Sequence, residues 1–200
     1  MGLKPRAKTT MTPMDVIVAR IRADGDQLMF RWPSLLDQDE SQYKKPQPLE
    51  DANKLRLPPN GAAMPADLTT WLQYTSSWPP LLDRGTAEAA SLLAMPLRET
   101  LTQWASDSEV VEEFLEDEVE EFGLASEEDI VNWWIGLLPS RDLADVYAVL
   151  LPSGDQECLL MLEEGRDELR VLGCHKFIEF WWKYKTFGEY LRHWFWGEEP

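Results

Sequence analysis

The sequence predicts an α+β fold in which an antiparallel β-sheet packs against several helices. Three observations predict it: apolar residues at helical spacing between residues 64 and 134, three short apolar runs between 145 and 174, and two more runs near the N-terminus. The chain has 200 residues, 44% of them hydrophobic and ten of them tryptophan, which is enough to bury a core of ordinary size.

Near the N-terminus, residues 16–22 and 27–32 are apolar and rich in β-formers, and an Asp-Gly-Asp turn sequence separates them. This pattern predicts a β-hairpin. Residues 37–60 are polar and proline-rich, as is typical of a surface loop or linker. We therefore divide the chain into residues 1–60, with a tail, the hairpin and the linker, and residues 61–200, which form the α+β domain.

Helices are predicted where capping residues precede apolar positions at helical spacing. Pro65 suits the first turn of a helix. Ser126 with Asp129, and Thr186 with Glu189, both have the spacing of a capping box. The predicted inward faces are Leu68, Trp71 and Leu72; Leu97, Leu101 and Trp104; Ile130, Trp133 and Trp134; and Phe187, Tyr190, Leu191 and Trp194.

The three apolar runs at 145–151, 156–162 and 168–174 are separated by short turn sequences, PSGD and EEGRD. Short turns join antiparallel neighbours, so these runs predict a three-strand meander at the C-terminal end of the domain. Cys158 and Cys174 fall on two of these strands. We expect buried free thiols in a reducing compartment, and a disulfide across neighbouring strands is the alternative.

The charge pattern is the strongest functional signal in the sequence. No lysine or arginine occurs between Arg98 and Arg141, whereas residues 107–129 hold 12 carboxylates. An apolar stripe with a helical period runs through the same segment, which predicts a folded acidic helix over residues 108–122 within an insertion at about 106–136. The stripe consists of Val110, Val111, Phe114, Leu115, Val119 and Phe122.

The acidic helix is predicted to bind a cationic partner, because acidic neighbours one turn apart repel each other by about 0.2–0.5 kcal/mol per pair. An acidic face that only keeps the protein in solution is the alternative. The predicted partner-binding carboxylates are Glu109, Glu112, Glu113, Glu116, Asp117, Glu120 and Glu121.

Aromatic residues make up ten of the 20 positions from 177 to 196. Most such rings pack in a core, but the run alternates too little to bury all of them. We expect Trp182, Tyr184 and Trp196 to be exposed rings that lock a partner in place, since aromatic residues are favoured binding hot spots.

The overall charge excludes several classes of partner. The net charge is −17, and residues 61–200, with 9 basic and 28 acidic residues, carry −19. Nucleic acids and anionic membranes attract Lys and Arg and are repelled by such a surface. The sequence contains no apolar run of about 18 residues, so it predicts no transmembrane helix. The N-terminus lacks the apolar region of a signal peptide. We expect a cytoplasmic protein that binds neither nucleic acid nor membranes.

No set of residues in the sequence predicts catalysis, a metal site or a cofactor. His175 follows Cys174 on a predicted strand, and successive strand residues point to opposite faces, so they do not form a dyad. His193 lies among aromatic residues without a metal-ligand spacing. Phosphate-loop and metal-binding motifs do not occur. A carbohydrate-active enzyme that uses paired carboxylates and tryptophans remains a remote alternative.

Three short motifs in residues 64–195 resemble the SUKH superfamily of α+β domains. Residues 64–72, MPADLTTWL, resemble its opening helix "LPxDYxxFL". Residues 150–155, LLPSGD, together with the predicted strand at 156–162 resemble its "P…GD" strand pair, and TFGEYL at 186–191 resembles its closing helix "SFxEFL". The family's usual Asn-Gly-Gly after the first helix is replaced here by TSSWPP.

The resemblance implies a function. Many bacterial SUKH domains are immunity proteins, which bind and neutralise toxin domains of polymorphic toxin systems and are not enzymes. We therefore predict an immunity-type inhibitor of a basic toxin or effector domain. A non-inhibitory adaptor or chaperone-like module for a basic effector is the alternative, and the oligomeric state is left open.

Overall fold

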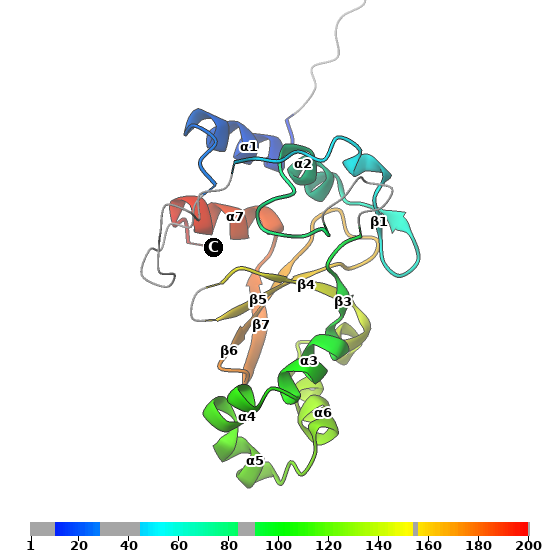
Figure 1. The fold of residues 1–200 in the computed structure, drawn as a ribbon, viewed down its shortest axis with the longest axis vertical. Helices are drawn as coiled ribbons and strands as arrows, with labels where there is room; N and C mark the ends of the chain where they lie inside the picture. Colours follow the sequence, from blue (N-terminus) through cyan, green and yellow to red (C-terminus); the bar gives the residue numbers. More distant parts are fainter. Residues whose placement is uncertain (1–10, 29–44, 84–90, 154–155, 200) are drawn as a thin grey trace, which may run out of the picture.

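The structure is a computed structural model, and it is described here over residues 11–28, 45–83, 91–153 and 156–199. Figure 1 shows a β-sheet in the middle of an elongated molecule, with α1, α2 and α7 at one end and α3 to α6 at the other. Helices and antiparallel sheets together confirm the predicted α+β fold.

The main sheet has five strands in the order β3-β4-β5-β6-β7, and every neighbouring pair is antiparallel. Its three central strands are the predicted meander, and a strand on each edge extends it. A small two-stranded sheet, β1-β2, lies apart from it. The strands are β1 (Arg56–Leu57), β2 (Ala62–Ala63), β3 (Met95–Pro96), β4 (Tyr147–Leu151), β5 (Glu157–Met161), β6 (Val171–His175) and β7 (Glu179–Tyr184).

Both faces of the sheet are buried, each by a different group of helices. In β5, Cys158 and Leu160 pack into the hydrophobic cluster that includes residues of α1, α2 and α7. Leu159 and Met161, which point the other way, pack into the cluster that includes residues of α3 and α6. This explains why β5 is apolar at consecutive positions.

The strand register keeps the two cysteines apart. Cys158 pairs with Gly173, and Cys174 pairs with Glu157. Paired residues share a face of a sheet and successive residues alternate, so the two thiols point to opposite faces. Both cysteines are buried and free, as the sequence predicted, and the alternative of a disulfide is wrong.

The predicted N-terminal hairpin is wrong, because residues 16–22 lie in helix α1 (Pro13–Ala23). Thr12 and Asp15 form a reciprocal capping box with bonds of 2.8 and 3.1 Å, and Pro13 occupies the first helical position. Residues 29–32 of the second predicted strand lie outside the described residues. The inward face of α1 joins the core of α2 and α7 through Met14, Ile17, Val18 and Ile21.

Two of the other predicted helices begin at the expected capping residues. Ser126 caps α6, and Thr186 caps α7, each by accepting a bond from the backbone N–H three residues on. The remaining elements are η3 (Ala52–Lys54), α2 (Ala66–Tyr74), α3 (Leu97–Ala105), α4 (Ser108–Phe114), α5 (Glu116–Phe122), α6 (Glu127–Leu137), η4 (Arg141–Asp145) and α7 (Phe187–Trp196).

Candidate functional site: an acidic lobe

The acidic run of the sequence forms two short helices at the end of the molecule opposite α1 (Figure 1). We call residues 107–129, which comprise α4, α5 and the first turn of α6, the acidic lobe. The prediction of one continuous helix is wrong, because the chain breaks at Leu115. Its backbone leaves the helical region (φ −123°, ψ 4°), and its side chain is 0% exposed in the core.

Capping groups fix the ends of the helices in the acidic lobe. The Asp107 carboxylate accepts a bond of 3.0 Å from the backbone N–H of Glu109 at the start of α4. Gly123, with φ of +64°, ends α5 in the left-handed conformation that glycine adopts most easily. Ser126 and Asp129 begin α6 with bonds of 2.7 and 3.2 Å. Two of the 12 carboxylates therefore have a structural role.

All seven predicted partner-binding carboxylates are exposed in the acidic lobe. Among the residues that the structure describes, no ion pair includes a carboxylate of this lobe. Glu109 and Glu113 in α4, and Glu116 and Glu120 in α5, are like-charged neighbours one turn apart. Their repulsion is not relieved within this part of the chain, so the lobe presents a surface suited to a cationic partner.

One aromatic residue, Phe177, joins the acidic lobe to the sheet. Lys176 and Phe177 both have positive φ in the tight turn between β6 and β7, which directs the ring towards the helices. The ring lies 4.9 Å from Trp104 and 5.4 Å from Phe114, measured between centroids, and the indole N–H of Trp134 donates to its carbonyl. In the sequence, Phe177 was only one of ten aromatic residues in its segment, and no pattern predicted that it joins the lobe to the sheet.

A cleft of about 320 Å³ lies where α4 meets the ends of β5 and β6. Its lining includes the acids Asp107, Glu109, Glu113 and Glu157 and the base Lys176, so four acids face one base. Burial raises the pKa of Glu157 above its ordinary value of 4.5.

The cleft holds no activated nucleophile of the cysteine type. Cys174 is part of its lining, but burial raises the pKa of this thiol to about 12. The thiol therefore stays protonated near neutral pH, and a protonated thiol is a poor nucleophile. The arrangement is suited to holding positive charge rather than to covalent chemistry.

The three predicted aromatic anchors lie outside the acidic lobe. Tyr184 is 1% exposed and belongs to the core, so its prediction as an exposed anchor is wrong. Trp182 is partly exposed, and the guanidinium of Arg170 covers its ring at 3.4 Å. Trp196 is also partly exposed, and its indole N–H donates to the Asp24 carboxylate.

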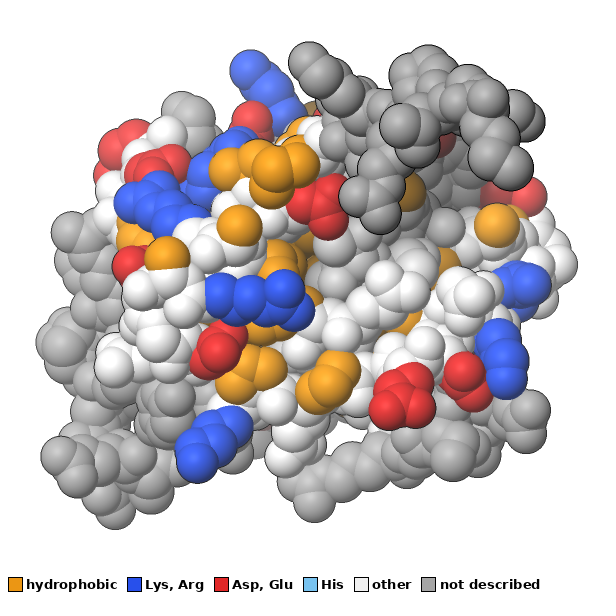
Figure 2. All heavy atoms as spheres, turned by 90° about the horizontal axis from the view of Figure 1, so that it is seen from above, with side chains coloured by type: hydrophobic (Ala, Val, Ile, Leu, Met, Phe, Trp, Pro, Cys, Tyr) orange, Lys and Arg blue, Asp and Glu red, His pale blue; other side chains and the backbone are white. Residues whose placement is uncertain are grey.

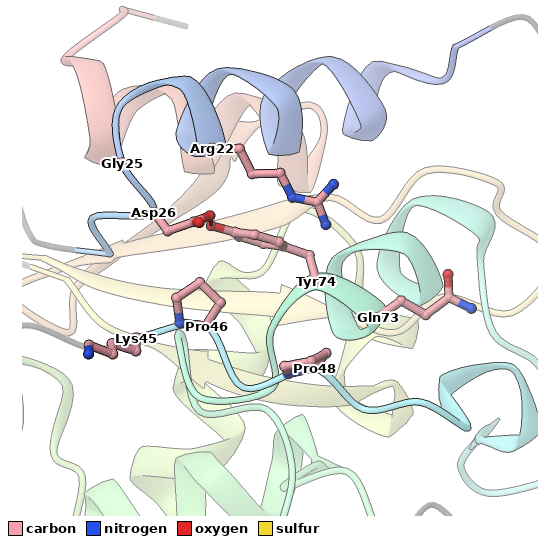
Figure 3. Close-up of a pocket in the computed structure, with 8 residues that line it drawn as sticks. All are labelled: Arg22, Gly25, Asp26, Lys45, Pro46, Pro48, Gln73 and Tyr74. Atoms are coloured by element: carbon pink, nitrogen blue, oxygen red, sulfur yellow. Dashed lines mark hydrogen bonds between the residues drawn. The ribbon is translucent and has the colours of Figure 1, made fainter.

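The opposite end of the molecule has mixed charge. Figure 2 shows Lys and Arg side chains there, interspersed with acidic and apolar ones. A hollow of about 490 Å³ lies near α1 and α2, lined in part by Lys45 (Figure 3). In it the Tyr74 hydroxyl donates to Asp26 at 2.7 Å, and Arg22 lies 5.3 Å from the Tyr74 ring. These groups already contact one another, so the acidic lobe is the better candidate for a binding site.

Among the described residues, no group of three or more His, Cys, Asp or Glu side chains is arranged to hold a metal ion. None of the helices in the described ranges has the length and apolar character needed to cross a bilayer.

Comparison of the chain with protein-family models, with curated proteins and with solved structures gave no significant match in any of the three. The resemblance to the SUKH superfamily therefore stays a prediction from short motifs.

Proposed function

We propose that this protein is an immunity-type inhibitor, which binds and neutralises a basic toxin or effector domain in the cytoplasm through its acidic lobe. The observation that carries the proposal is the set of exposed carboxylates in the lobe, none of which has an ion-pair partner in the described chain. Enzymes that cut nucleic acids or handle phosphates expose Lys and Arg around their active sites, and these side chains complement the lobe.

The three segments that resemble SUKH motifs support the proposal by their structure. Residues 64–72 lead into and fill most of helix α2, and residues 186–191 begin helix α7 at its capping residue. Strands β4 and β5, which flank the PSGD sequence, pair as antiparallel neighbours. The order helix, strand pair, helix is the one that the resemblance implies.

The mechanism would rest on electrostatic attraction followed by occlusion. A lobe with 12 carboxylates and no lysine or arginine attracts a basic surface over distances of about 10 Å at moderate ionic strength. Such attraction raises association rates, to about 10⁸–10⁹ M⁻¹s⁻¹ in the fastest complexes. The lobe projects from the sheet (Figure 1), so it can cover a basic active site without rearrangement of the main core.

The test is affinity capture from the source cells at low and then high salt, followed by an activity assay of the captured protein. We expect a single basic enzyme domain that high salt releases and whose activity is abolished in the complex. A basic partner that stays fully active in the complex would favour the adaptor alternative. Failure to capture a basic partner at low salt would contradict the proposal.

A further inference from the structure

Helix α5 differs from the other α-helices in the described residues because none of its side chains is buried. Its last residue, Phe122, is 55% exposed, and Val119 one turn earlier is only partly buried. Exposing a phenylalanine forgoes the favourable transfer of its ring out of water. Among the described residues, α5 contacts the core through the partly buried Val119 and through Phe122 against Trp133, so much of its surface stays open to a partner.

The exposed Phe122 ring also contacts a second aromatic ring. Its ring packs against that of Trp133 on α6, with the centroids 5.7 Å apart and the planes inclined by 32°. Trp133 is itself only partly buried. The two rings thus form an aromatic pair at the surface of the acidic lobe, far from the aromatic run of residues 177–196 in the sequence.

Carboxylates surround the aromatic pair. Glu118 lies one helical turn before Phe122 on α5, and Asp129 lies one turn before Trp133 on α6. Glu121 is the immediate neighbour of Phe122 and is exposed. An apolar centre with a charged rim is the usual arrangement of a protein-binding hot spot.

We propose that Phe122 and Trp133 form the anchor of the acidic lobe, and that this anchor takes an apolar side chain flanked by lysine or arginine on a basic protein partner. The inference rests on the proposed function and adds to it the residues that hold the complex together. The carboxylates speed the encounter, and the aromatic pair slows dissociation.

Charge complementarity selects this occupant over two others. A second copy that docked through the same face would bring 12 further carboxylates against the first 12. Nucleic acid would bring phosphates, which the lobe repels. A basic protein segment satisfies both the rim and the centre, because its cations meet the carboxylates and its apolar side chain covers the rings.

Two synthetic peptides of equal length and equal positive charge provide the test, used with the full-length protein. One peptide carries leucines between its lysines, and the other carries serines at those positions. The wild-type protein should bind the leucine peptide at least about tenfold more tightly, as truncation of aromatic hot spots changes affinity by this factor or more. Phe122→Ser should abolish the preference. Because Phe122 is exposed, the variant should fold, which circular dichroism verifies.

Leu150→Ser is the matched control, because Leu150 is 49% exposed on β4, outside the acidic lobe. It should keep the full preference for the leucine peptide. Equal binding of the two peptides to the wild type would overturn the anchor, and so would an unchanged preference in Phe122→Ser. A wild-type dimer that Phe122→Ser dissociates, seen by analytical ultracentrifugation, would also overturn it, in favour of a second copy as occupant.

The failure of the anchor and the failure of the proposed function give different results. If the anchor alone is wrong, the wild-type protein binds both peptides equally. A triple variant then weakens the binding of both peptides; it combines Glu112→Lys, Glu116→Lys and Glu120→Lys. If the acidic lobe does not bind cations, that triple variant leaves the binding of both peptides unchanged, and the anchor and the proposed function fall together.

Discussion

The two ends of the molecule use charge in opposite ways. At the end formed by α1 and α7, Arg20 forms an ion pair with Glu198 and lies 3.9 Å from the centroid of the Trp196 ring, while the Trp196 indole donates to Asp24 at 3.0 Å. In the acidic lobe no ion pair of this kind occurs within the described ranges. Charged side chains at the first end hold two helices of one chain together, whereas we propose that those in the lobe bind another molecule.

The same contrast holds for the aromatic residues. Trp196 is only partly exposed and is used within the chain, by Arg20 and by Asp24. Phe122 is 55% exposed, and within the described ranges its aromatic neighbour is Trp133. An aromatic residue is therefore a candidate for partner binding when its ring is left exposed by the rest of the fold. Its position in an aromatic-rich stretch of sequence does not decide this.

The largest expected effect comes from removing the core on which the acidic lobe rests. Trp134 is 0% exposed and packs with Trp104 and Phe177. Trp134→Ala should lower the free energy of unfolding by about 3–5 kcal/mol, as other large-to-small core substitutions do. Urea unfolding measures the loss, and hydrogen exchange should show the lobe losing more protection than α1.

Trp71→Ala provides the matched substitution in the other core cluster, where Trp71 is also 0% exposed. It should cost a similar free energy but remove protection from α1 and α2 first. Equal loss of protection throughout the chain in both variants would show that the two ends unfold as one unit, and it would contradict the comparison.

A smaller effect is expected where α1 and α7 meet. Trp196→Ala removes the hydrogen bond to Asp24 and the stacking on Arg20, and should lower the free energy of unfolding by about 2 kcal/mol. Because it lies outside the acidic lobe, binding of the two synthetic peptides should not change. A loss of peptide affinity in this variant would return Trp196 to the role of partner anchor that the sequence suggested.

Neutralising a repulsive pair in the acidic lobe should stabilise the protein slightly. Glu120→Gln removes the repulsion from Glu116 one turn earlier and should raise the free energy of unfolding by about 0.2–0.5 kcal/mol at low salt. Glu198→Gln, which breaks the ion pair with Arg20, should instead lower it. Both effects should shrink as salt is added, since exposed charges are screened. Destabilisation by Glu120→Gln would show that its carboxylate is already satisfied.

The smallest expected effect concerns pH. Burial raises the pKa of Glu157 above 4.5, so the folded state holds this proton more tightly than the unfolded state. The stability that this group contributes is therefore lost as the pH rises from the ordinary pKa of the carboxyl through its raised pKa in the folded state. Glu157→Gln should flatten that part of a stability profile measured between about pH 4 and pH 7.

Burial also raises the pKa of Asp67, with Glu168 as the second cause, so this group acts in the same direction as Glu157. Some fall in stability with rising pH should therefore remain in Glu157→Gln. A profile that this variant does not alter would show that the Glu157 carboxyl is as well solvated in the folded state as in the unfolded one.

Local signals allowed much of the fold to be predicted. Ser126 and Thr186 mark helix starts because a side-chain cap acts within four residues and needs no tertiary partner. The same signal at Thr12 and Asp15 could have identified α1, but β-branched residues in the segment favoured a strand. Strand β7 was missed, because aromatic residues at consecutive positions hide the alternation of a strand.

The candidate site could be predicted only in part. Charge is a property of the sequence itself, so the exposed carboxylates were found correctly. Exposure of an aromatic ring depends on what packs over it. Tyr184 is covered by the core of α7, whereas Phe122 is left open because the chain breaks at Leu115 and α5 turns away. The break depends on tertiary burial of Leu115, which no local pattern revealed.

The most direct test of the central claim compares association rates with the captured basic partner for three proteins across a range of salt. They are the wild type, the lobe variant with Glu112, Glu116 and Glu120 changed to Lys, and a control variant with the exposed residues Glu50, Asp167 and Glu179 changed to Lys. Both variants change the net charge equally. We predict slow, nearly salt-independent association for the lobe variant alone. Equal slowing in both variants would show that net charge, and not the acidic lobe, drives binding, and would contradict the account.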